Sequence, residues 1–180
     1  MKAGERKLEQ RKKILETWID LYGHRLVRLA YTYVQDSATA EDRVQDAFIK
    51  VYGQFNKFKD GSDPFPWLAR IVINECKMAY RSNWREIVSS MLPEKEVVSS
   101  EDEFLSMEAD EMLYALILKL PEPYRIAIVL YYFEELSVQK IAAILGKREG
   151  TIKSRLSRGR HRLRKFWKER DTYETAIQNC

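Results

Sequence analysis

Residues 136–168 constrain the fold of this chain more than any other stretch. Apolar residues recur at helical spacing over positions 138–145 and again from Ile152 onward. Gly146 separates the two runs, and because only glycine enters the left-handed conformation of a tight turn at little cost, the first helix is predicted to end there. Ser137 is expected to be the N-cap of that helix. Two helices joined by a short glycine-containing turn form a helix-turn-helix, in which the second helix reads DNA.

The second helix is strongly basic. Ten lysine and arginine residues lie between positions 147 and 168, where Glu149 is the only acidic residue. So many like charges repel one another, which favours a polyanionic partner over a merely solvated helix surface. One face, opposite the apolar stripe, offers short polar groups for base edges and long cations for phosphates, and it carries Thr151, Ser154, Arg158 and Lys165.

The whole chain has the composition of a folded protein without membrane spans. Its 180 residues allow one domain or two small ones, and the mean hydropathy is -0.47. The longest apolar run, positions 126–133, is too short to cross a bilayer, and no apolar run follows the basic N-terminus as a signal peptide requires. Cys76 and Cys180 are too far apart in sequence to suggest a disulfide framework, which indicates a reducing compartment. We therefore expect a cytoplasmic protein.

Apolar residues at helical spacing indicate three helices in the N-terminal half and four in the C-terminal half, with no alternating strand pattern in the N-terminal half. Asp36 or Ser37 is expected to cap the second helix, and Pro64 or Pro66 to lie in the first turn of the third. Between the halves, a run rich in acidic residues has no helical period and is predicted to be a flexible linker. The predicted fold is all-α, with helical domains at residues 1–82 and 105–180 joined by an acidic linker at residues 83–104.

Three segments in this order resemble the bacterial sigma factors of the extracytoplasmic-function (ECF) group. ATAEDRVQDAFIKVY resembles the segment with which that family grips the clamp helices of RNA polymerase, and PWLARIVINECKMAYR resembles its promoter-melting helix. LPEPYRIAIVLYYFEELSVQKIAAIL, followed by GTIKSRLSRGRHRLR, resembles its DNA-binding fourth domain. The resemblance covers nearly the whole chain, and it implies that residues 1–82 correspond to sigma domain two and residues 105–180 to sigma domain four.

The resemblance also implies three sets of contact residues. Those for core RNA polymerase are Asp42, Gln45 and Asp46, and we favour this role over the alternative that they are ordinary acidic and polar residues early in a helix. Those for the -10 promoter element are Lys57, Lys59, Phe65, Arg70, Asn74, Lys77, Tyr80 and Arg81, with Trp67 expected in the core. Those for the -35 element are Arg148, Thr151, Lys153, Ser154, Arg155, Ser157, Arg158, Arg162 and Lys165.

Within the -35 set, Arg158 and Ser154 are expected to reach base edges, while the flanking Arg155, Arg162 and Lys165 hold phosphates. Two features depart from expectation. Arg148 and Glu149 stand where members of the family often carry serine or proline. The resemblance therefore does not identify the N-cap of the reading helix or the angle at which the chain enters it. Gly159 lies in the middle of that helix and should cost up to about 1 kcal/mol relative to alanine. Close packing is the only reason we can give for it.

The function that the resemblance implies is promoter selection: an alternative sigma factor that binds core RNA polymerase and directs it to promoters with specific -10 and -35 elements, where transcription begins. The family usually answers to an anti-sigma factor, often membrane-bound, in stress or envelope responses. A freestanding helix-turn-helix repressor and a DNA-acting enzyme are the alternatives, but the N-terminal half offers no clear dimerisation surface, ligand pocket or polar site. With no catalytic motif or metal-ligand spacing, we expect no enzyme activity, cofactor, metal or small-molecule substrate.

Overall fold

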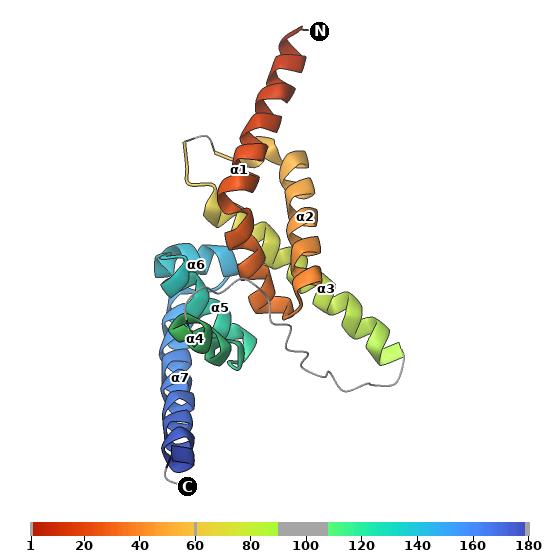
Figure 1. The fold of residues 1–180 in the computed structure, drawn as a ribbon. Helices are drawn as coiled ribbons and strands as arrows, with labels where there is room; N and C mark the ends of the chain where they lie inside the picture. The colour runs from red at the N-terminus through yellow and green to blue at the C-terminus, as the bar shows by residue number, and fades with distance from the viewer. Residues whose placement is uncertain (1, 60, 90–107, 179–180) are drawn as a thin grey trace. The chain divides into compact units, whose positions relative to one another are not determined.

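A computed structural model describes residues 2–59, 61–89 and 108–178, with side chains over residues 8–59, 61–79 and 112–169 (Figure 1). These parts are helical and contain no strand, which confirms the all-α prediction. The chain divides into two compact units, which we describe separately. The first is built from α1 (Lys2–Val34), α2 (Ser37–Gly53), the 3-10 turn η1 (Phe55–Lys57) and α3 (Phe65–Ser89). The second consists mainly of α4 (Glu108–Leu118), α5 (Glu122–Ile128), the π-helical turn η2 (Val129–Phe133), α6 (Val138–Leu145) and α7 (Glu149–Gln178).

Side-chain caps fix where the helices of the first unit begin. The Asp36 carboxylate accepts a hydrogen bond from the Thr39 N–H at 2.7 Å, so Asp36 is the N-cap of α2, as predicted. The Asp63 carboxylate accepts from the Phe65 N–H at 3.0 Å at the start of α3. Pro66 follows in the first turn, where its missing N–H costs nothing.

The core of the first unit lies between α1, α2 and α3. The predicted apolar faces are buried, and they contribute Leu26, Leu29, Ala40, Val44, Ala47, Phe48, Val51, Leu68, Val72 and Cys76. An aromatic cluster adds to this core, in which the Trp18 ring stacks on Phe55 at 5.3 Å between centroids. Phe58 and Trp67 complete the cluster, and Trp67 lies 5.4 Å from Phe58 and 6.2 Å from Trp18. Trp67 therefore packs with the core, as expected.

Helix α3 is longer than the sequence suggested. It runs to Ser89, so residues 83–89, predicted as the start of the linker, are helical. The apolar period is weak there, but an established helix continues at little cost, because each added residue gains a hydrogen bond. Residues 90–104 of the predicted linker lie outside the described residues.

Helix α5 is the centre of the second unit. It packs against α4 and α7, and every residue from Arg125 to Leu130 is buried rather than one face alone. The sequence predicted a single apolar face because neighbours on several sides cannot be read from a short segment. The buried Arg125 guanidinium donates a hydrogen bond to the Leu118 carbonyl at 2.7 Å, which satisfies an acceptor at the end of α4.

The helix-turn-helix is confirmed in α6 and α7. Ser137 Oγ accepts a hydrogen bond from the Lys140 N–H at 3.2 Å and caps α6. Gly146 has a φ of +62°, and the following Lys147 N–H donates to the Ala142 carbonyl at 3.0 Å, a Schellman turn. The Arg148 carbonyl accepts from Thr151 and Ile152. Helix α7 therefore begins at Glu149, whose charge suits the positive end of the helix dipole.

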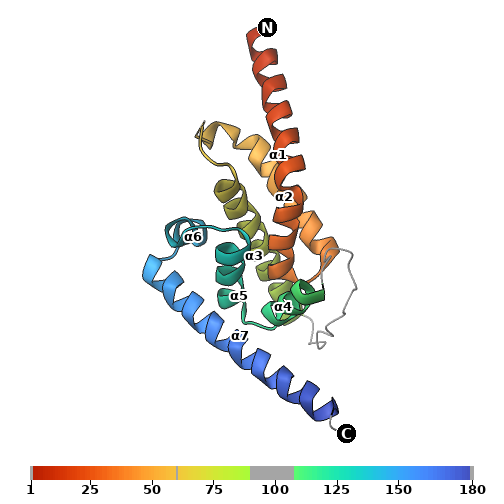
Figure 2. The ribbon, with the colours of Figure 1, turned by 60° about the vertical axis from the view of Figure 1, so that its left-hand side comes forward.

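Gly159 marks the point at which α7 crosses α5. A Cβ atom at this position would lie 3.0 Å from Ile128 Cγ1 and 3.5 Å from Tyr124 Cβ. Close packing is therefore the reason for this glycine. Farther along α7, Trp167 was predicted to continue the apolar stripe, but it is 43% exposed, because α7 there runs on past α5 (Figure 2). Among the described residues, no helix is both long and apolar enough to span a bilayer.

Candidate protein and nucleic-acid interfaces

Helix α2 presents its polar residues away from the core. Asp42 and Gln45 are exposed, on the side opposite the buried Val44 and Phe48. The Asp46 side chain is 43% exposed, and its carboxylate pairs with the Arg43 guanidinium at 2.9 Å. The three predicted residues are therefore accessible together, although the negative charge at Asp46 is partly compensated within the helix.

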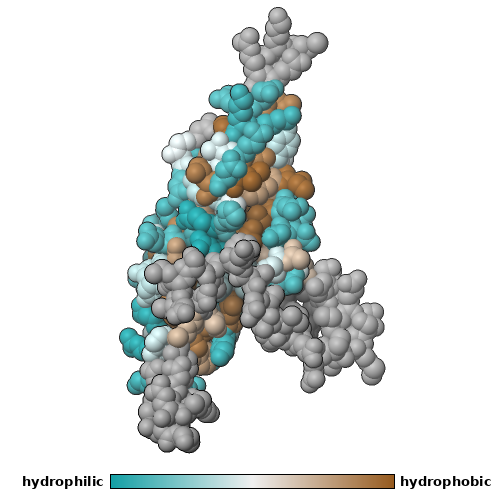
Figure 3. Space-filling model, viewed as in Figure 1, coloured by the Kyte–Doolittle hydropathy of each residue, from teal (hydrophilic) through white to brown (hydrophobic). Residues whose placement is uncertain are grey.

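Sequence reasoning missed an apolar residue on this face. Ile49 follows Gln45 by four positions and Asp42 by seven, so it shares their side of α2, and it is 71% exposed. Tyr52 is also exposed, at 38%. Figure 3 shows hydrophobic surface over α1 and α2. An apolar centre with a polar rim is the usual composition of a protein-protein interface. The available signal was that Ile49 falls outside the period of the buried positions.

An ion pair ties α2 to α3. Lys50 Nζ pairs with the Glu75 carboxylate, whose side chain is only 8% exposed. Beside it, burial raises the pKa of the Cys76 thiol from 9.0 to about 12, an effect that the nearby Arg43 charge partly offsets. Cys76 is therefore a neutral core residue, and the Lys50–Glu75 pair joins α2 to α3 next to it.

Helix α3 carries a polar face on its first half. Arg70 and Asn74 are exposed and Lys77 is half-buried, and steps of four and three residues place them on one side of the helix. The side chains of the predicted Tyr80 and Arg81 lie outside the described residues. Met78, which was not predicted, is 58% exposed and follows Asn74 by four positions, so it lies on the same face of α3. The face combines cations, an amide and an apolar group, which suits an unstacked nucleic-acid strand.

Before α3, the loop offers exposed cations, but Phe65 must be withdrawn from the candidate DNA contacts. Lys57 and Lys59 are exposed. Phe65 is 2% exposed, and the Arg25 guanidinium lies 4.0 Å from its ring centroid. Because Tyr22 also packs against it, a base could reach the Phe65 ring only if the start of α3 came apart. Its helical spacing from Leu68 and Val72 marked it as a core position.

Helix α7 displays nearly all of the predicted -35 contacts to solvent. Arg155 is half-buried beside the apolar stripe, and the exposed residues are Arg148, Thr151, Lys153, Ser154, Ser157, Arg158, Arg162 and Lys165. Lys165 Nζ lies 3.6 Å from the Glu169 carboxylate, an exposed pair that holds Lys165 only weakly. The helix therefore presents short hydroxyl side chains and long cations on its outer surface.

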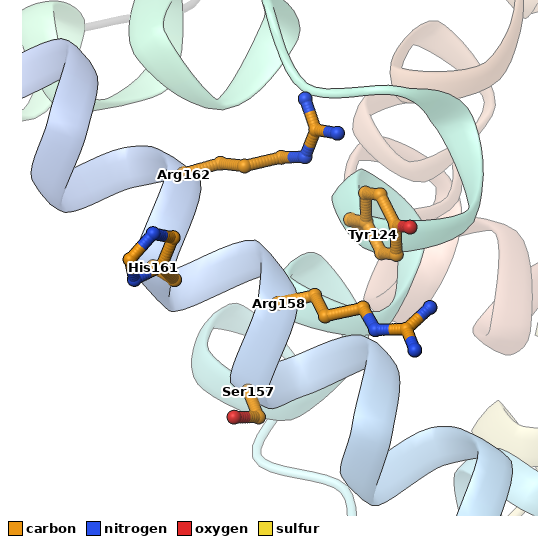
Figure 4. Close-up of a pocket in the computed structure, with 5 residues that line it drawn as sticks. All are labelled: Tyr124, Ser157, Arg158, His161 and Arg162. Atoms are coloured by element: carbon orange, nitrogen blue, oxygen red, sulfur yellow. The ribbon is translucent and has the colours of Figure 1, made fainter.

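A shallow groove of about 510 Å³ lies between α5 and α7 and was not anticipated. Figure 4 shows the Arg158 and Arg162 side chains extending from α7 toward Tyr124 on α5. The Arg162 guanidinium lies 5.5 Å from the centroid of the Tyr124 ring, within cation-π range. Ser157 and His161 complete the lining. Arg158, expected to reach base edges beside Ser154, thus shares a site with Arg162. Only the packing of α5 on α7 reveals Tyr124.

Comparison with known proteins identifies both units. The model of sigma-70 region 2 matches residues 18–86, and the model of sigma-70 region 4 matches residues 110–163. The chain is 32% identical over 159 residues to the ECF RNA polymerase sigma factor SigW of Bacillus subtilis, covering 82% of this chain and 85% of SigW. It is 33% identical over 154 residues to the ECF RNA polymerase sigma-E factor of Escherichia coli K12, covering 79% and 80% of the two chains.

Solved structures agree with this comparison. The sigma factor RpoE of Bartonella quintana, in a co-crystal structure with the anti-sigma factor NepR, superposes with a TM-score of 0.75 at 30% identity, covering 87% of this chain and 98% of RpoE. CnrH, in complex with the cytosolic domain of CnrY, superposes with a TM-score of 0.63 at 20% identity, covering 90% and 95%, and shares the fold.

Proposed function

We propose roles for the two units from one premise: this chain belongs to the ECF family of RNA polymerase sigma factors. Sigma factors are not enzymes; they bind core RNA polymerase and direct it to promoters. Because the chain belongs to this family, we set aside the two alternative functions, a freestanding repressor and a DNA-acting enzyme. The observation that carries the assignment of roles is that each candidate surface lies on an exposed helix face within a matched region.

The exposed face of α2 binds core polymerase in this proposal. Asp42 and Asp46 supply charge for orientation, and Ile49 supplies apolar area that is exposed in the free protein. Asp42→Lys combined with Asp46→Lys should weaken binding to core polymerase while leaving helical content unchanged, because neither side chain is in the core. Glu9→Lys combined with Glu16→Lys, on the exposed side of α1, makes the same change in charge elsewhere. Equal affinity of the two double variants would remove the assignment.

The polar face of α3 binds the -10 element in this proposal. Separating the strands requires groups that hold an unstacked base and its phosphates, and Asn74 lies between Arg70 and Lys77 on one face. Asn74→Ala should slow strand opening at the promoter, measured by permanganate reactivity of unpaired thymines, while core binding stays the same. If opening is unchanged, Asn74 has no part in melting.

The outer surface of α7 binds the -35 element in this proposal. Thr151, Ser154 and Ser157 are short enough for base edges to approach, and the surrounding cations hold phosphates. Ser154→Ala should cost about 1 kcal/mol on the preferred sequence, the worth of one hydrogen bond, and relax discrimination at one base pair. Lys165→Ala should instead weaken all sequences alike. The measurement is holoenzyme binding to a panel of -35 duplexes, and a change of ranking with Lys165→Ala would reverse the two roles.

An anti-sigma factor is the second protein partner that we propose. RpoE, at 30% identity, was solved with one, and apolar residues such as Leu21 (63% exposed) and Ile49 need cover when polymerase is absent. We place the complex in the cytoplasm or at a membrane-bound anti-sigma factor, as part of a stress or envelope response. The test is competition: the anti-sigma protein should displace the chain from core polymerase, and Ile49→Asp should weaken both complexes. A partner that binds together with core polymerase would contradict this.

The acidic linker, which lies outside the described residues over 90–104, has two candidate roles. Its acids imitate phosphates in the RNA channel of the polymerase, or the segment is a solvated tether. Neutralising Glu94, Glu96, Glu101, Asp102 and Glu103 should change the ratio of abortive to full-length transcripts in the first case only.

A further inference from the structure

The groove between α5 and α7 is lined by cationic and hydroxyl-bearing side chains, the kinds that bind phosphate groups. The Arg158 and Arg162 side chains extend into it from α7, and their guanidinium groups lie on either side of Tyr124, which enters from α5 (Figure 4). Among the described residues that line it, none is acidic. Guanidinium forks match the geometry of phosphate oxygens, and a phenolic hydroxyl can donate a further hydrogen bond to the same group.

The Tyr124 and Arg162 side of the site is ordered before any ligand binds. Gly159 lies between Arg158 and Arg162 in sequence, and it allows α7 to approach α5 so closely that a Cβ there would lie 3.5 Å from Tyr124 Cβ. The Tyr124 ring in turn supports the Arg162 guanidinium at 5.5 Å. An arginine that is already stacked loses less rotamer freedom when it binds an anion.

We propose that Tyr124, Arg158 and Arg162 together hold a single backbone phosphate of duplex DNA beside the -35 element. This inference rests on the proposed role of α7 in binding that element. It assigns Arg158 to positioning rather than to base reading, and it adds Tyr124, on α5, to the DNA interface. A duplex is the favoured ligand because the groove opens on the helix with ten cations between positions 147 and 168, and a carboxylate of a partner protein is the competing one.

Holoenzyme binding to DNA at several salt concentrations tests whether the phosphate is shared. Each phosphate contact contributes about 0.9 to the slope of log affinity against log salt concentration. Because both arginines hold the same phosphate, Arg158→Gln combined with Arg162→Gln should make the slope shallower by about 0.9 in total, whereas two separate phosphates would give about 1.8. Arg164→Gln makes the same change in charge outside the groove. In the double variant Arg162→Gln, Arg164→Gln, the two reductions in slope should therefore simply add.

Selection from duplexes randomised over the -35 element tests the role of Arg158 without knowledge of the promoter. Arg158→Gln holoenzyme should enrich the same sequence as the unchanged holoenzyme, and Tyr124→Phe, which keeps the ring under Arg162, should bind that sequence roughly tenfold more weakly. A different enriched sequence with Arg158→Gln would overturn the proposal. So would an unchanged salt slope in the double arginine variant, which would favour a carboxylate ligand. If the unchanged holoenzyme enriched no sequence, the proposed function itself would fail.

Discussion

Replacing Gly159 with alanine tests how closely α7 packs against α5. The new methyl group would lie 3.0 Å from Ile128 Cγ1 and 3.3 Å from its Cδ1, both well inside ordinary van der Waals contact. Ile128 is 2% exposed and β-branched, so its side chain has little room to rotate away. We therefore expect Gly159→Ala to destabilise the second unit, although alanine is the better helix former.

The expected size follows from two opposing effects. Overpacking a well-packed core costs about 1–3 kcal/mol, while glycine to alanine within a helix gains up to about 1 kcal/mol. With the full gain subtracted, the net loss should be up to about 2 kcal/mol. Gly150, in the first turn of α7, provides the matched control, because a Cβ there would meet nothing within 4 Å. Gly150→Ala should be neutral or stabilising.

Hydrogen exchange of the backbone amides measures the effect within each unit. Amides of α5 and α7 should exchange faster in Gly159→Ala, whereas those of α1 and α2 serve as an internal reference. Ile128→Ala removes both contacting carbon atoms, so in that background Gly159→Ala should no longer destabilise. Slower exchange in the single variant, or an equal loss in both backgrounds, would refute the steric argument.

Three further changes test the packing of the two units. Glu75→Gln should lower the free energy of unfolding by about 1 kcal/mol, because Lys50 loses its ion-pair partner but is exposed enough to be hydrated instead. Thermal unfolding measures this loss, and an unchanged free energy would show that the ion pair does not contribute to stability. Because the pKa of Cys76 is raised to about 12 in the folded chain, the unfolded chain alone loses the thiol proton above pH 9.0, so stability should fall as pH rises from there toward 12. Cys76→Ala should remove that part of the pH dependence. Arg125→Met should cost about 1–3 kcal/mol by leaving the Leu118 carbonyl without its donor, and unchanged exchange in α4 would contradict this.

The sequence predicted the local features of the fold well. Ser137, Gly146 and Asp36 act through backbone geometry and hydrogen bonds to near neighbours, so their roles can be read from a few residues. The buried faces of α2 and α3 followed from the helical period in the same way. Gly159 could be recognised as unusual, but its reason lies 31 positions earlier in the chain, at Ile128.

The candidate surfaces were harder to predict because exposure depends on packing. In the sequence Ile49 is one apolar residue among several, and only the packing of α2 shows that its side chain points away from the core. Phe65 was assigned to DNA by resemblance, although its spacing placed it on the buried stripe. The groove around Tyr124 joins two helices whose crossing no local pattern reports.

Reconstitution with core RNA polymerase tests the central claim most directly. The purified chain and core enzyme are mixed with a library of promoter-length duplexes, and transcripts are mapped at their 5′ ends. The account predicts a stable complex and transcripts that start at fixed sites, preceded by shared -10 and -35 sequences, only when both proteins are present. Specific binding of the chain to DNA with no complex and no defined start sites would contradict it.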